Sequence, residues 1–106
     1  MFINLTPHTI SVQRIDGSML EIPASGTIAR CTVEQELVDH IDGVDLFRTT
    51  YGNVTNLPNE VAGTFYIVSM PVRLAQPWRL DLLSPGELIR NDQGQPVGCK
   101  GFACNL

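Results

Sequence analysis

The sequence has few charged residues and very few basic ones. Asp, Glu, Lys and Arg make up 17% of the 106 residues, and the single lysine, Lys100, accompanies six arginines. With a net charge of −4, the chain lacks the basic surface that binding to a nucleic-acid polymer requires. A low charge is typical of a compact β-rich domain, or of an oligomer that covers part of its surface.

Paired cysteines and long apolar runs are also missing. Cys31, Cys99 and Cys104 form no CxxC motif, and His8 and His40 lie far from them in the sequence. A structural zinc site normally has paired ligands at short spacing. No apolar run approaches the roughly 18 residues of a membrane span, and the N-terminus lacks the pattern of a signal peptide. We therefore expect free thiols, no metal or cofactor, no membrane contact and a cytoplasmic location.

The patterns of common enzyme classes do not occur. Ser69 and Ser84 lack a G-x-S-x-G elbow, and no phosphate-binding glycine loop is present. Five acids lie between Glu34 and Asp45, but they have no calcium-loop spacing. A solvated acidic face is the simpler interpretation of that cluster. We predict that the protein is not an enzyme.

Short alternating segments and frequent turn residues predict one mainly β domain over residues 1–106. The expected class is α+β with a small mixed or antiparallel sheet, barrel- or sandwich-like, and one or two short helical turns; an all-β fold is the alternative. Hairpins are expected around the turns at 16–18, 42–43 and 92–95. We expect about eight short strands among the nine candidate segments FINL, TISVQRI, MLEI, TIARCTV, VDLFRTTY, TFYIVSM, RLDLL, ELIRN and PVGCKGF, and a brief helix in PVRLAQPW.

Some segments carry conflicting signals. Residues 32–42 fit either a helix that begins with a capping box or one strand of a hairpin, and we favour the hairpin. Gly52 is expected to interrupt the strand before it, the loop after it to contain one tight helical turn, and "SPG" at 84–86 to form a turn. Phe47, Leu57 and Trp78 are expected to pack in the core. The nearly continuous apolar segment TFYIVSM predicts a strand in the middle of a sheet.

Arginines in and beside loops are the remaining candidates for binding a ligand. A guanidinium group suits phosphate or carboxylate, threonine hydroxyls can hydrogen-bond to the same groups, and a tyrosine ring can stack on a base. For Arg79 a structural ion pair with Asp81 is the alternative, because residues i and i+2 of a strand share a face. The candidate ligand-binding residues are Arg48, Thr49, Thr50, Tyr51, Arg79 and Arg90.

Several blocks of the chain resemble a family of small bacteriophage and prophage proteins. They are INLTPHTISV, PASGTIAR, RTTYGNVTNLP, GTFYIVSMPVRLA, RLDLLSPG and IRNDQGQPVGCKGF. The resemblance implies a protein made in the cytoplasm of an infected or lysogenic bacterium. It implies no established enzymatic activity, so it transfers no catalytic residue.

Two functions fit these observations. The first is a non-enzymatic binding protein of phage origin, a homo-oligomer that captures a small anionic nucleotide-like molecule and so acts as a sponge for a host defence signal. The alternative is a protein-interaction or structural accessory module, either a virion part or an inhibitor of a host protein. A site in which the arginines converge would favour the first, and scattered arginines would favour the second.

Overall fold

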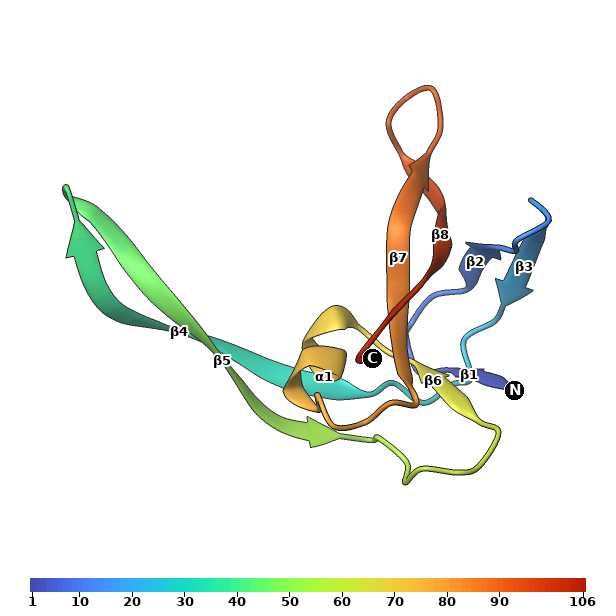
Figure 1. The fold of residues 1–106 in the computed structure, drawn as a ribbon, viewed down its shortest axis with the longest axis horizontal. Coiled ribbons are helices and arrows are strands. Elements are labelled where there is room, and N and C mark those ends of the chain that lie inside the picture. Colours follow the sequence, from blue (N-terminus) through green and yellow to red (C-terminus); the bar gives the residue numbers. More distant parts are fainter.

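The computed structural model describes residues 1–106 and shows a mainly β protein with one short helix (Figure 1). Six strands form one mixed, nearly closed, barrel-like sheet, and two long strands form a separate hairpin. The expected barrel-like, β-rich class is therefore confirmed. The elements are β1 (Phe2–Asn4), β2 (Ile10–Gln13), β3 (Met19–Ile22), β4 (Arg30–Ile41), β5 (Val44–Thr55), β6 (Phe65–Ile67), α1 (Met70–Ala75), β7 (Leu82–Arg90) and β8 (Pro96–Cys104).

The six-stranded sheet has the order β1-β6-β7-β8-β2-β3. The pairs β1–β6, β6–β7 and β2–β8 are parallel, whereas β2–β3 and β7–β8 are antiparallel hairpins. Of the predicted hairpins, those around residues 16–18 and 92–95 lie in this sheet. As the apolar run predicted, β6 lies inside the sheet, between β1 and β7, and Tyr66 and Ile67 are buried.

One buried side chain joins the two edge strands of this sheet. Asn4, at the end of β1, is 1% exposed. Its amide group donates to the carbonyl oxygens of Ile22 (2.9 Å), at the end of β3, and of His8 (2.8 Å). Its Oδ1 accepts from the backbone N–H and the hydroxyl of Thr6. Every polar atom of this buried amide is thus satisfied, as burial requires, and the amide links the two edges.

The hydrophobic core is small and consists of two groups. Fourteen of the 106 residues are buried. One group surrounds α1 and the N-terminal end of β7, and comprises Leu5, Ala29, Tyr66, Val68, Val72 and Leu82. The other lies between β2, β3, β6 and β8, and comprises Val12, Ile22, Ile67 and Cys99.

The β4–β5 hairpin, which we call the arm, leaves the body as a twisted two-stranded ribbon (Figure 1). Each strand has 12 residues, and the register shifts near Cys31 and again near Leu37. Only Cys31 and Val54, at the base of the arm, are partly buried against the core, where α1 also packs. Every residue from 32 to 53 is exposed. The arm therefore has no covering layer within its own chain.

Several local expectations were wrong. Gly52 lies within β5, where a β-carbon would collide with the side chain of Thr32 on β4. Residues 84–86 lie within β7, and Gly86 is needed there because a β-carbon would come within 2.8 Å of the Lys100 carbonyl oxygen on β8. Both sites are close approaches between paired strands, for which glycine is suited as well as for turns.

Further expectations concerned which large apolar residues are buried and which segments are helical. Phe47 is 56% exposed and Trp78 is 67% exposed, so neither is a core residue, whereas Leu57 does pack against the core. The segment 32–42 is strand, as favoured, and ends at the predicted turn at Asp42 and Gly43. No helical turn forms in the loop after Gly52. The only helix, α1, has six residues, too few to cross a membrane.

Candidate functional site

The candidate residues Arg48 to Tyr51 lie in the middle of β5, on the arm. Successive residues of a strand point to opposite faces. Arg48 and Thr50 therefore lie on one face of the arm, and Thr49 and Tyr51 lie on the other. The four side chains therefore cannot surround one small ligand within a single chain. Alternation along the predicted strand VDLFRTTY already implied this split.

The two faces of the arm have different chemistry. On one face Arg48 is paired with Glu36, with 3.9 Å between Nη1 and Oε2, and Thr50 is opposite Glu34. Both charged groups of the Arg48–Glu36 pair are more than 60% exposed, so the ion pair adds little stability. On the other face Gln35 and Thr49 hydrogen-bond to each other across the strands, at 3.0 and 3.2 Å.

Arg79 lies in the body and is already paired within the chain. Its Nε and Nη2 each donate to one oxygen of Asp81 at 2.8 Å, and Nη2 also donates to the Pro58 carbonyl oxygen at 3.0 Å. Both residues of the pair are 8% exposed. The hydrogen bonds from Arg79 hold the pKa of Asp81 below its usual value, and those to Asp81 raise the pKa of Arg79. This is the structural ion pair given as the alternative for Arg79, but the stated reason was wrong, because residues 79–81 lie in the turn before β7 and not in a strand.

Arg90 stands at a third place, the far end of β7. Its Nη1 donates to the Gly94 carbonyl oxygen at 2.8 Å and so closes the turn between β7 and β8. This hairpin end and the arm project from the body in different directions (Figure 1). The structure thus places Arg48, Arg79 and Arg90 on the arm, in the body and at a hairpin tip, and does not bring them together.

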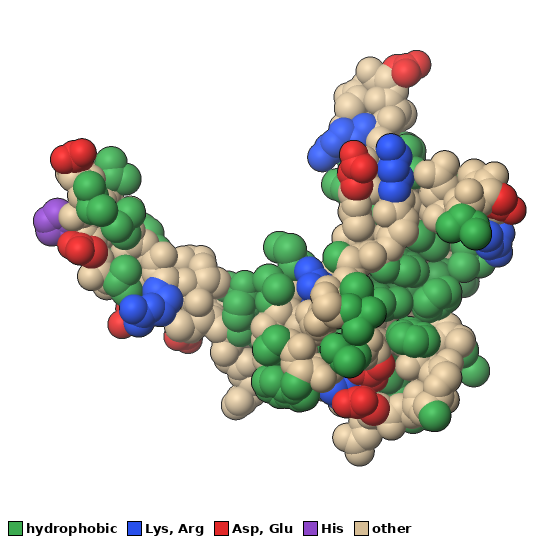
Figure 2. All heavy atoms as spheres, in the orientation of Figure 1, with side chains coloured by type: hydrophobic (Ala, Val, Ile, Leu, Met, Phe, Trp, Pro, Cys, Tyr) green, Lys and Arg blue, Asp and Glu red, His purple; other side chains and the backbone are tan.

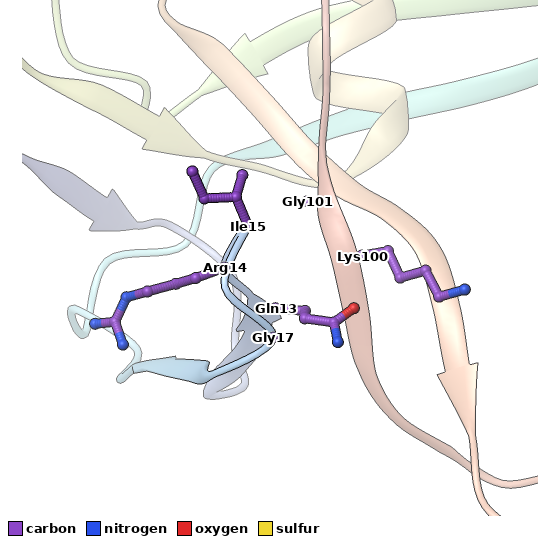
Figure 3. Close-up of a pocket in the computed structure, with 6 residues that line it drawn as sticks. All are labelled: Gln13, Arg14, Ile15, Gly17, Lys100 and Gly101. Atoms are coloured by element: carbon purple, nitrogen blue, oxygen red, sulfur yellow. The ribbon is translucent and has the colours of Figure 1, made fainter.

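Other cavities offer no convergent cations either. The hollow in Figure 3, of about 380 Å³, lies between the β2–β3 turn and β8. Of its two basic residues, Arg14 extends away from Lys100 (Figure 3). Arg14 hydrogen-bonds to Ser18, and Nζ of Lys100 lies 4.0 Å from Oε2 of Glu87. A second hollow of about 390 Å³ along β2, β7 and β8 has no lysine, arginine or acid in its lining. Neither is built to hold an anion.

Groups suited to catalysis or metal binding are dispersed. No three His, Cys, Asp or Glu side chains are close enough to hold a metal ion together. All three cysteines are free thiols. Burial raises the pKa of Cys99, which keeps this thiol protonated and unreactive.

The most unusual surface of the molecule is one that sequence reasoning missed. Apolar side chains are exposed along the whole length of the arm, where Figure 2 shows them among acidic groups. They are Val33, Leu37, Val38, Ile41, Val44, Leu46, Phe47 and Tyr51, all at least 37% exposed. The sequence did contain a signal for this exposed surface. The two strands predicted on either side of the turn at 42–43 contain several large apolar residues and, together with that turn, five acids. In a covered core hairpin so many acids would be costly.

Comparison of the chain with models of protein families, with curated proteins and with solved structures gave no match.

Proposed function

We propose that this protein is a non-enzymatic interaction module that works by binding another protein surface through the β4–β5 arm. The observation that carries the proposal is the arm itself. A two-stranded hairpin is at best marginally stable in water when no further strand or helix packs on it. Here two 12-residue strands project without such a layer, and their apolar side chains face solvent. A partner that covers the arm supplies the missing layer.

The apolar side chains on the arm are numerous and form cross-strand pairs on both of its faces, Leu37 with Phe47 on one face and Ile41 with Val44 on the other. Leu37, Ile41, Val44 and Phe47 are each 56–63% exposed. Scattered exposed apolar residues are common, but a contiguous patch usually marks a binding surface. Aromatic residues such as Phe47 and Tyr51 are also enriched in protein–protein interfaces.

The distribution of charge gives the arm a second distinguishing property. Over the whole arm, residues 30–55, there are five carboxylates and two arginines, and the rest of the chain has six acids and five basic residues. Most of the net charge of −4 therefore lies on the arm. A concentrated charge of one sign next to an apolar surface steers a partner and discriminates against wrong ones. We propose that such a module serves as a virion part or as an inhibitor of a host protein, in line with the expected resemblance to phage proteins.

The hypothesis of a captured nucleotide-like anion remains a prediction. In one chain the six candidate residues are divided among the two faces of the arm, the body and a hairpin tip. An anion site that used several of them would need residues from more than one subunit. The dispersed arrangement favours the interaction module.

The proposal can be tested by site-specific photo-crosslinking in cells that produce the protein. A photoreactive phenylalanine analogue at Phe47 is compared with the same analogue at Val61, a loop residue that is also 56% exposed. We expect covalent adducts with a protein from the Phe47 variant and few from the Val61 variant. Absence of adducts at Phe47, or an equal yield at both positions, would refute the role of the arm. The mass of the adduct also distinguishes a second copy of the chain from a different protein.

A further inference from the structure

Six residues in the central part of the arm, three from each strand, form what we call the uncharged face. The strand register pairs Val33 with Tyr51, Gln35 with Thr49 and Leu37 with Phe47. These three cross-strand rungs share one side of the ribbon, because alternate residues of a strand point the same way. In order along the arm they are apolar, polar and apolar. Glu34, Glu36 and Arg48 lie on the opposite side.

The whole chain exposes more surface than a compact monomer of its size. Its accessible surface is 7104 Å², whereas a compact monomer of 11.7 kDa is expected to expose about 5,900 Å². The Cα radius of gyration is 16.1 Å, against about 13 Å for a compact domain of this length. The excess is therefore roughly 1,200 Å² per chain. Covering half of it on each of two chains buries about 1,200 Å² in total, which is enough for a specific interface.

The order of the rungs makes the uncharged face complementary to itself. A two-fold axis that runs midway between the Gln35–Thr49 rungs of two chains, parallel to both, would stack the Val33–Tyr51 rung of one chain on the Leu37–Phe47 rung of the other. Apolar side chains then meet apolar ones, and the hydrogen-bonded polar rung meets its own copy. Such a contact is isologous, the commonest symmetry of homodimers. Two sheets packed in this way lie about 10 Å apart.

From these observations we infer that a second copy of the chain covers the uncharged face, and that the arms of two chains stack face to face about a two-fold axis. The inference rests on the proposed interaction role and names its first partner. The charges on the arm agree with this arrangement. The carboxylates of Glu34 and Glu36 point away from the contact and remain in water, whereas stacking through the opposite face would bring four of them together.

Two neighbouring threonines provide a matched pair of variants. Thr49 lies in the central rung of the uncharged face, and Thr50 lies on the opposite face next to Glu34. Thr49→Lys and Thr50→Lys make the same chemical change on the same strand, and both reduce the negative charge of the arm equally. Only Thr49→Lys brings two like charges to the two-fold axis.

The experiment is sedimentation of the purified full chain at about 1 to 100 µM, a range that resolves micromolar dissociation constants, with far-UV circular dichroism as a check on folding. We expect the wild type and Thr50→Lys to be dimers, and the dissociation constant of the Thr49→Lys dimer to be at least tenfold higher. Phe47→Thr, which adds no charge and keeps a residue of high β-strand propensity, should weaken the dimer in the same direction and decides the matter if Thr49→Lys is unfolded. A monomeric wild type, or equal effects of the two lysines, would overturn the inference. If crosslinks at Phe47 lead only to a different protein, the interaction role stands and the dimer does not.

Discussion

Replacing Asp81 with asparagine should destabilise the protein strongly, because it leaves the cation of Arg79 buried without its counter-ion. The two side chains form two parallel hydrogen bonds of 2.8 Å, and each residue is only 8% exposed. Removing one partner of a buried ion pair costs about 3–5 kcal/mol. Small domains have a total stability of about 5–15 kcal/mol, so Asp81→Asn should lose a large part of it.

Glu60 provides the internal control for this prediction. Its carboxylate lies 3.5 Å from Nε of Arg79 but is 61% exposed, so Glu60→Gln should cost less than about 1 kcal/mol. In urea unfolding, with a slope of roughly 1–1.5 kcal/mol/M for a domain of this size, the midpoint of Asp81→Asn should fall by roughly 2–5 M. All variants have to be compared at one protein concentration, because self-association would add stability that depends on concentration.

The same pair predicts a dependence of stability on pH. The pKa of Asp81 is lowered in the folded protein by its hydrogen bonds to Arg79, below the unfolded value of about 3.9. Its contribution to stability is therefore complete above the unfolded pKa and is lost as the pH falls through the folded pKa. Asp81→Asn should lack this part of the acid destabilisation. The pKa of Arg79 is raised, so Arg79 adds no dependence between pH 4 and pH 9.

The result that would refute this reasoning is a free energy of unfolding for Asp81→Asn within about 1 kcal/mol of the wild type. A loss of stability for Asp81→Asn that only equals the loss for Glu60→Gln would also refute it. Either outcome would mean that Arg79 is not fixed by Asp81, and it would return Arg79 to the set of residues available for an external anion. A large and selective loss would assign the pair to the stability of the body.

Two other predictions concern the closure of the sheet and the anion hypothesis. Asn4→Ala should cost about 3 kcal/mol in the same unfolding assay, because it leaves the backbone groups that the buried amide satisfies without hydrogen-bond partners. A loss below about 0.5 kcal/mol would show that Asn4 does not join β1 to β3. If the protein captures a nucleotide-like anion, a linear or cyclic nucleotide at 100 times its dissociation constant should add about 2.7 kcal/mol of stability. No thermal shift with any nucleotide at millimolar concentration would contradict that hypothesis.

Much of the local structure follows from short sequence signals. The turns at Asp16-Gly17 and Asp42-Gly43 each connect two antiparallel strands, as their residues indicate. The pairing of Arg79 with Asp81 depends on a spacing of two residues along the chain, so it too is a local property. The brief helix at Met70–Ala75 begins with proline in its first turn, where proline is favoured.

Other features depend on which segments meet, and no local pattern records that. Ser84, Pro85 and Gly86 are typical of a turn, yet β8 pairs with them and extends the strand. The apolar residues Leu37 and Phe47 indicate a buried face, but alternation along a strand tells only which side chains share a face and not what covers it.

The sequence by itself determined the β-rich class, the alternation along each strand and the concentration of negative charge between residues 34 and 45. Tertiary structure decided that the candidate arginines are separated and that β4 and β5 leave the body as an uncovered arm. The physical reason is that faces and pairs are set by the long-range register of strands, and burial is set by the packing of one layer on another. A missing layer becomes visible only when the whole chain is folded.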